Sequence, residues 1–154
     1  MRRRLPPLLR QAWYELNRAF RRRIAHTGVT PDQFTVLRIL TEHPGGLSQS
    51  EITRAMASDP NTVAAMLDRM ETTGLLSRGR HESDQRARRI RLRELGKKKY
   101  EIIRQLAVEI QIEVLSALPL ATREEFLRNL AAVADACATA AAAALLARPA
   151  KGPT

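Results

Sequence analysis

The sequence has few of the residues that build catalytic or redox sites. It holds one cysteine, Cys137, in 154 residues, which excludes an intramolecular disulfide and a cysteine-based zinc cluster. Its three histidines, His26, His43 and His81, lie far apart and lack the paired spacing of a metal site. The sequence also lacks a glycine-rich phosphate loop and a Gly-x-Ser-x-Gly turn. These absences argue against an enzyme, and we expect no metal and no cofactor.

Long apolar runs and aromatic residues are also scarce. The longest apolar run, residues 140–147, is too short to span a bilayer. The basic amino terminus, MRRRLPPLLRQ, is interrupted by prolines and its apolar part is too short for a signal sequence. Aromatic residues make up 4% of the chain, while alanine and leucine are abundant, which favours helices packed on helices. We therefore expect a cytoplasmic protein that forms one domain, or one domain with an added interface.

Positive charge, in contrast, is plentiful, and the net charge of +10 is concentrated in two segments. Residues 1–29 hold eight basic and one acidic residue, and residues 75–99 hold ten basic and three acidic ones, so each segment carries +7. A merely solubilising surface mixes its charges, whereas clustered arginines suit phosphates, which accept paired hydrogen bonds. The pattern indicates a nucleic-acid partner, with an anionic membrane surface or a simply soluble basic surface as the alternatives.

Capping residues and apolar spacing predict helices in the first half of the chain. Apolar residues recur every three or four positions from residue 5 to about residue 26, and Gly28 ends this first helix. Thr30 and Gln33 have the spacing of a capping box, as do Ser48 and Glu51, so helices are expected to begin at both places.

The helices expected at residues 48–56 and 60–73 form a candidate helix-turn-helix. Asp59 is expected to cap the second helix and Gly74 to close it. Both helices are short, each has an apolar face, and the turn between them is tight. An ordinary pair of core helices fits the spacing equally well.

An antiparallel hairpin is expected after this pair, with strands at residues 75–80 and 88–93 and a loop at residues 81–87. In the second strand Ile90 and Leu92 alternate with arginines, so the aliphatic side chains are expected to face the core. Arg89, Arg91 and Arg93 would share the opposite face, where they repel one another until a phosphate backbone relieves the repulsion. The alternative is an exposed strand whose charges prevent edge pairing.

Residues 59–96 hold an ordered set of residues that is typical of one family of regulators: Thr62, Val63, Met70, Glu71, Gly74, Leu75, Asp84, Arg86, Leu92 and Gly96. With this set, the segment resembles the recognition helix and wing of the MarR family of bacterial transcriptional regulators. The resemblance departs from the family pattern at Ala64 and Ala65, where many members carry a hydroxyl and an arginine, and at Arg93, where threonine is usual. The order of the surrounding helices agrees, so it covers roughly residues 5–147. The implied fold is mainly α, with a two- to three-stranded antiparallel wing (an α/β winged helix-turn-helix).

The resemblance implies a sequence-specific DNA-binding regulator, by family analogy a ligand-responsive repressor, that acts as a homodimer on a pseudo-palindromic operator. The helix at residues 60–73 would enter the major groove and present Asn61, Thr62 and Ala65. Ser48 and Gln49, at the start of the preceding helix, would contact phosphates.

The wing supplies the other implied DNA contacts. Arg86 at its tip would enter the minor groove, oriented by Asp84, and the alternative is an exposed Asp–Arg pair without a role. Arg69 is expected either to contact a phosphate or to pair with a carboxylate. The remaining predicted contacts are Arg78, Arg80, Arg88, Arg89 and Arg91.

Residues outside this lobe are expected to form the dimer. We divide the chain into an N-terminal dimerisation helix at residues 1–28, a DNA-binding lobe at 29–96, C-terminal dimerisation helices at 97–147 and a disordered tail at 148–154. Thr122 and Glu125 are expected to cap the last helix. Cys137, in an alanine-rich helix without nearby cations, is expected to be an inert buried thiol, with a redox sensor as the alternative.

A small-molecule effector is the least specified partner. The resemblance implies a pocket near Trp13, Phe34 and Arg38, although each of these residues fits a plain core or surface position as well. The expected partners are therefore double-stranded DNA, a second copy of the chain and an effector, in the cytoplasm at the nucleoid, with no membrane. The competing functions are a general nucleic-acid-binding module, and an enzyme acting on a phosphorylated substrate, which would need a convergent polar pocket.

Overall fold

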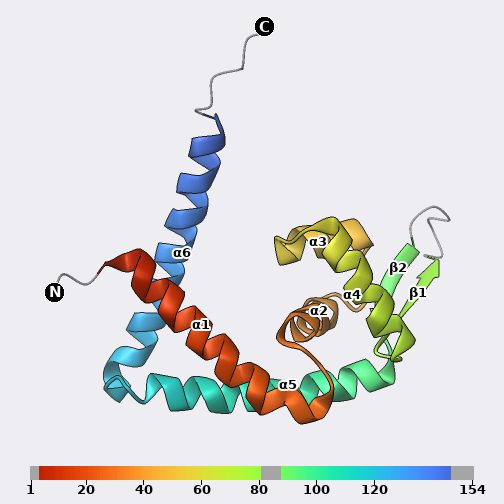
Figure 1. The fold of residues 1–154 in the computed structure, drawn as a ribbon, viewed down its shortest axis with the longest axis horizontal. Helices are drawn as coiled ribbons and strands as arrows, with labels where there is room; N and C mark the ends of the chain where they lie inside the picture. Colours follow the sequence, from red (N-terminus) through yellow and green to blue (C-terminus); the bar gives the residue numbers. More distant parts are fainter. Residues whose placement is uncertain (1–3, 81–87, 147–154) are drawn as a thin grey trace, which may run out of the picture. The chain divides into compact units, whose positions relative to one another are not determined.

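The computed structural model describes residues 4–80 and 88–146 (Figure 1). The chain divides into two compact units, the first ending at Ile110 and the second beginning at Gln111. The expected hairpin loop at residues 81–87 and the expected tail at residues 148–154 lie outside the described residues. Most of the described residues are helical and one small antiparallel sheet accompanies them, so the predicted fold class is confirmed.

The first helix, α1, runs from Leu5 to Ile24 and continues as a 3-10 turn, η1, from Ala25 to Thr27. Gly28 follows with a φ of 73°, the left-handed conformation that commonly ends helices and that glycine adopts without a steric penalty. The predicted helix end is therefore confirmed. Only Ile24 of α1 is buried, so most of this helix is accessible in the single chain.

Three further helices complete the helical part of the DNA-binding lobe expected from the sequence: α2 at Pro31–Glu42, α3 at Gln49–Met56 and α4 at Pro60–Thr72. Both predicted capping boxes are present. The Thr30 hydroxyl accepts a hydrogen bond from the Gln33 backbone N–H, and the Gln33 side chain accepts one from the Thr30 N–H. Ser48 and Glu51 make the same reciprocal pair at α3. These bonds satisfy backbone N–H groups that a helix start leaves without partners.

The sheet pairs β1, Leu76–Arg80, with antiparallel β2, Arg88–Leu92. Arg78 lies opposite Ile90 in the register, and an isolated bridge from Leu47 to Ile90 adds a third short piece. Each strand is one residue shorter than expected at the end near the helices, where Leu75 and Arg93 are still joined by a hydrogen bond.

The core of the first unit collects apolar side chains from α1 to α5 and from both strands. Ile90 is 1% exposed, and Leu92 packs against the core from a half-buried position, as their alternation with arginine predicted. Because these contacts join elements from the whole unit, they fix α3, α4 and the sheet in one arrangement. The buried cluster consists of Ile24, Val29, Val36, Leu37, Leu40, Ile52, Val63, Met66, Leu67, Met70, Leu75, Leu76, Ile90 and Ile103.

The long helix α5, Glu94–Leu115, begins directly after the sheet. Gly96 packs so closely there that a Cβ at this position would lie 2.1 Å from the Leu75 carbonyl oxygen. The second unit contains the 3-10 turn η2, Leu120–Thr122, and α6, Arg123–Leu146. None of the described helices is both long and apolar enough to cross a membrane.

Two expectations for the second unit are wrong. Thr122 does not form a capping box with Glu125, because its backbone already belongs to η2 and its hydroxyl donates to the Pro119 carbonyl oxygen at 2.9 Å. Cys137 is exposed rather than buried. The reason is that none of the side chains described at residues 111–144 is buried, so the described part of α6 has no fully buried face within one chain.

Candidate nucleic-acid interface

The turn between α3 and α4 spans residues 57–59 and ends in a well-formed helix cap. One oxygen of Asp59 accepts hydrogen bonds from the Thr62 backbone N–H at 2.8 Å and from the Thr62 hydroxyl at 2.9 Å. These bonds, the one from the backbone first, lower the pKa of the Asp59 carboxyl below its usual range. The carboxylate is therefore charged at neutral pH, as suits the positive end of a helix.

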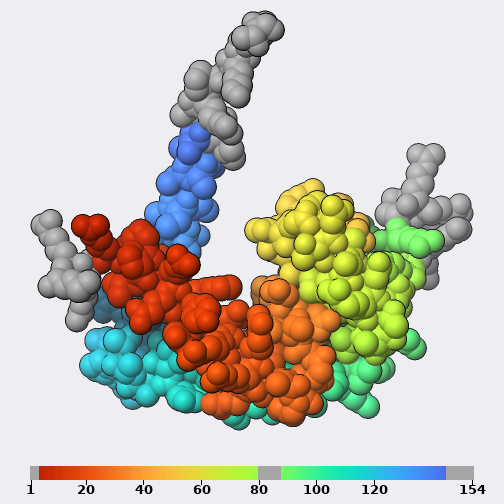
Figure 2. Space-filling model, viewed as in Figure 1, coloured from red at the N-terminus to blue at the C-terminus, as the bar shows by residue number. Residues whose placement is uncertain are grey.

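The two faces of α4 differ sharply in burial. Val63, Met66, Leu67 and Met70 are buried in the core. The opposite face is exposed, and Figure 2 shows the α3 and α4 region, in yellow to yellow-green, at the surface of the molecule. These helices are therefore not a fully buried pair, and α4 can present side chains to a partner. Its exposed residues include the predicted contacts Asn61, Thr62, Ala65 and Arg69, together with Asp68.

The start of α3 lies beside an open hollow that reaches the start of α4. The Ser48 hydroxyl accepts from the Glu51 N–H and lies 3.1 Å from the Ser50 hydroxyl, while Gln49 is half-buried. Sequence reasoning missed the exposed Ser50, Arg54 and Ser58 at this hollow. Their place around the helix-helix turn was the available signal. The hollow is lined by Gln49, Ser50, Thr53, Arg54, Ala57, Ser58 and Pro60.

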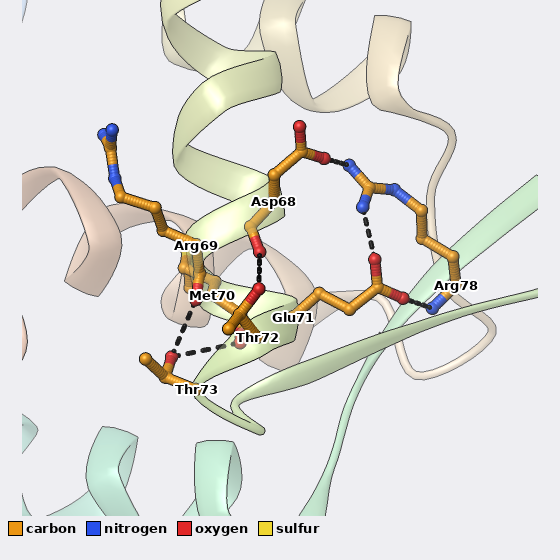
Figure 3. A network of polar contacts seen from close by, with 7 residues as sticks. All are labelled: Asp68, Arg69, Met70, Glu71, Thr72, Thr73 and Arg78. Atoms are coloured by element: carbon orange, nitrogen blue, oxygen red, sulfur yellow. Dashed lines mark hydrogen bonds and ion pairs between the residues drawn. The ribbon is translucent and has the colours of Figure 1, made fainter.

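Two predicted contacts, Arg69 and Arg88, are exposed and form no ion pair with any described residue. In Figure 3 the Arg69 side chain points away from the neighbouring carboxylates of Asp68 and Glu71. Of the two roles left open for Arg69, pairing with a carboxylate is therefore not seen in the described structure. Asp84 and Arg86 lie outside the described residues. For Arg80 the structure describes only the backbone, which pairs with Arg88.

Arg78, in contrast, is held by two carboxylates of α4 (Figure 3). One terminal nitrogen of its guanidinium donates to Asp68 at 2.7 Å and the other donates to Glu71. The Arg78 backbone N–H also donates to Glu71, at 3.2 Å. The guanidinium first and the backbone N–H second lower the pKa of the Glu71 carboxyl. Burial acts to lower the pKa of Arg78, but these carboxylates outweigh it and raise that pKa.

Arg89 and Arg91 are half-buried and bonded within the fold, which differs from the outward row of arginines expected on β2. The Arg89 guanidinium donates to Glu51 at 2.8 Å, and Arg91 Nε donates to the Gly45 carbonyl oxygen at 3.1 Å. Glu51 also accepts from the Ser48 N–H, the main cause of its lowered pKa. Much of the expected repulsion is therefore relieved inside the protein, because α3 brings a carboxylate to the strand.

The three predicted effector residues have different surroundings. Phe34 stacks on Tyr100 with ring centroids 5.7 Å apart and meets Phe20 edge-on at 5.4 Å. Trp13 is 67% exposed, and Arg38 is exposed and pairs with Glu42 at 3.0 Å. Their role in binding an effector stays a prediction.

Known proteins resemble this chain in sequence and in fold. A model of the MarR family matches residues 29–87. Transcriptional regulator HosA of Escherichia coli O111:H- is 31% identical over 96 residues, which are 59% of this chain and 70% of that protein. TtmR, an HTH-type transcriptional regulator of Methylorubrum extorquens, is 35% identical over 86 residues, or 56% of this chain and 44% of that protein. The structure of the transcriptional repressor CouR bound to a 23-mer DNA duplex is 30% identical with a TM-score of 0.77, covering 85% of this chain and 92% of CouR.

Proposed function

This chain belongs to the MarR family of transcriptional regulators, and we propose that it is a sequence-specific, DNA-binding repressor that acts as a homodimer. The observation that carries the proposal is the capped helix α4, which buries one face and exposes Asn61, Thr62 and Ala65 on the other. A helix of this kind, following a second short helix, fits the major groove of DNA. The repressor CouR, which shares the fold at 30% identity, is bound to a DNA duplex.

The proposed contacts fall into two groups. Asn61, Thr62 and Ala65 meet base edges. Because Ala64 and Ala65 offer no hydrogen-bonding side chain, methyl contacts and DNA shape carry part of the specificity. Phosphates and the minor groove are met by residues around the helix-turn-helix and on the wing. This second group consists of Ser48, Gln49, Arg69, Arg80, Asp84, Arg86, Arg88 and Arg91.

A second copy of the chain is the proposed cover for the exposed apolar side chains outside the lobe. Trp13 and Leu16 of α1 and Phe126 of α6 are among several large apolar side chains that are exposed in one chain. On α1 alone the exposed large apolar side chains include Leu5, Leu8, Trp13, Tyr14 and Leu16, which is more than singly scattered apolar residues explain and supports an interface. In a twofold dimer, two α4 helices would meet successive major grooves about 34 Å apart, which requires a pseudo-palindromic operator.

We also propose that an effector bound near Trp13, Phe34 and Arg38 releases the protein from DNA, and that the protein works in the cytoplasm at the nucleoid. The aromatic cluster around Phe34 joins α1, α2 and α5, so a ligand there would act on the helices that connect the dimer to the lobe.

The test is a titration of the purified protein against its own upstream DNA and against scrambled DNA of equal length, each at two salt concentrations. A preference of about 10³ or more for the upstream fragment supports the repressor, since specific binding typically exceeds non-specific binding by at least this factor. Equal affinity for every fragment of a genomic library would refute it. That result would favour a general nucleic-acid-binding module, for which the scarcity of base-reading side chains at Ala64 and Ala65 is the supporting observation.

A further inference from the structure

Arg78 is the wing arginine that forms the most ion pairs within the described fold, one with Asp68 and one with Glu71. It lies in β1, its side chain is 15% exposed, and both terminal nitrogens of its guanidinium are bonded to carboxylates of α4. Its backbone N–H completes the contact by donating to Glu71. A single carboxylate, Glu71, therefore holds both the backbone and the side chain of one strand residue.

These bonds cross from one element to another, as the Arg89–Glu51 pair also does, whereas pairs such as Arg104–Glu101 lie within a single helix. Asp68 and Glu71 lie one helical turn apart on α4, while Arg78 lies in the strand that follows. The planar guanidinium can meet both carboxylates only at a restricted distance and orientation of strand and helix. The contact thus fixes the direction in which β1 leaves α4.

The charge balance also argues against a phosphate contact. Arg78 and its two carboxylates together carry a net charge of −1, and Asp68 is 68% exposed on the face of α4 that also exposes Ala65. If Arg78 turned to a phosphate, it would leave two uncompensated carboxylates on a helix that approaches a polyanion. Where it lies, it weakens their repulsion of DNA.

We propose that Arg78 is a positioning residue that sets the wing against the recognition helix, and that it does not bind phosphate. The inference rests on the proposed function, because it concerns the same interface. Specific binding requires α4 and the wing to dock in adjacent grooves at once, so a fixed angle between them favours the operator over other sequences. Loss of Arg78 therefore lowers discrimination between DNA sequences, whereas loss of a phosphate ligand weakens all sequences alike.

Arg88 is the natural comparison, because it pairs with Arg80 at one end of the sheet, is exposed, and has no ion pair among the described residues. A phosphate ligand in each protomer accounts for about 1.8 in the slope of log affinity against log salt for a dimer, at about 0.9 per phosphate. The salt slope therefore separates an arginine that touches phosphate from one that positions another element.

The experiment measures affinity at four salt concentrations for two duplexes of equal length. The first is a duplex selected by the wild-type protein from a random library, and the second is its scrambled sequence. The variants are Arg78→Ala, Glu71→Gln and Arg88→Ala. Arg104→Ala serves as a matched control, because it removes an arginine–carboxylate pair that lies within a single helix, α5. Circular dichroism and the thermal midpoint establish that each variant is folded under the binding conditions.

For Arg78→Ala we expect the preference for the selected duplex to fall at least about tenfold, the scale of a lost charged hydrogen bond. Its salt slope should stay within about 0.5 of the wild-type value, while that of Arg88→Ala falls by about 1.8. Glu71→Gln keeps an acceptor for the Arg78 N–H but removes the charge, so it should also lower the preference. Arg104→Ala should change neither quantity.

The opposite pattern overturns the inference. If Arg78 binds phosphate, Arg78→Ala lowers the slope by about 1.8 and keeps the preference. In that case Glu71→Gln, which frees the guanidinium, tightens binding to both duplexes. If the wild-type protein shows no preference at all, the proposed function fails. The slope on the scrambled duplex still decides whether Arg78 touches phosphate, so the two failures remain distinguishable.

Discussion

Substitution of Gly46 by alanine should destabilise the lobe through two separate effects. Gly46 has a φ of 83°, and a Cβ placed there would lie 2.8 Å from the Ile90 carbonyl oxygen and 2.8 Å from Cγ of Arg91. The Ile90 oxygen cannot retreat easily, because it accepts a hydrogen bond from the Leu47 N–H at 3.1 Å, and Ile90 donates to the Leu47 oxygen at 2.7 Å. The substitution therefore strains the bridge between Leu47 and Ile90, which is the only isolated β-bridge among the described residues.

The magnitude follows from the two effects. A left-handed backbone costs a non-glycine residue about 1–2 kcal/mol, and forcing an extra methyl into a closely packed site costs about 1–3 kcal/mol. We therefore expect Gly46→Ala to lower the free energy of unfolding by about 2–5 kcal/mol, a large share of the roughly 5–15 kcal/mol of a typical domain.

Two other glycines separate the effects. Gly28 has a φ of 73° but nothing within 4 Å of an added Cβ, so Gly28→Ala should show the backbone cost alone. Gly45 has neither a positive φ nor a close neighbour, so Gly45→Ala should be close to neutral. The assay is urea unfolding followed by circular dichroism at one fixed protein concentration, because dissociation of a dimer makes stability depend on concentration. A Gly46→Ala variant that loses no more stability than Gly28→Ala would refute the predicted clash.

Three further predictions concern the helix cap, the dimer and the wing. The pKa of Asp59 is lowered in the folded state, so the charged Asp59 cap stabilises the fold. This contribution to the free energy of unfolding is fully present above the ordinary aspartate pKa of about 3.9 and is lost as the pH falls through the lowered value. Urea midpoints from about pH 6 to pH 2 should therefore fall less for Asp59→Asn than for the wild type, and parallel curves would contradict this. Trp13, the single tryptophan, is 67% exposed in one chain. Its fluorescence should shift to shorter wavelength as dimers form on raising the concentration, in step with sedimentation, and a monomer at micromolar concentration would refute the dimer. Arg86→Ala should weaken binding to the selected duplex at least about tenfold without changing the thermal midpoint, the scale expected for a minor-groove arginine, and an unchanged affinity would remove Arg86 from the interface.

Local features of the fold could be predicted from the sequence because their partners lie within a few residues. The capping boxes at Thr30 and Ser48, the Asp59 cap and the helix end at Gly28 all depend on contacts across two to four positions. Such contacts form whenever the helix forms, whatever packs against it. The alternation on β2 likewise identified the core-facing Ile90, since the period of a strand is a local property.

The candidate site was predicted less completely. The exposed face of α4 follows from helical periodicity, and the structure places Asn61, Thr62, Ala65 and Arg69 there as expected. The wing arginines are alike in sequence, yet Arg88 is unpaired among the described residues while Arg78 and Arg89 are bound to carboxylates. Composition alone could not distinguish them.

The sequence by itself determined which segments are helices and strands, where the helices of the DNA-binding lobe begin, and that the charge of the chain suits a polyanion. Only the tertiary structure decided which of those charges are available to a partner. Glu51 pairs with Arg89, which lies 38 residues further along the sequence. The Gly96 backbone packs against Leu75, although both strands of the wing separate the two residues in sequence. Contacts of this kind depend on how the core sets one element against another, so neither spacing nor periodicity encodes them.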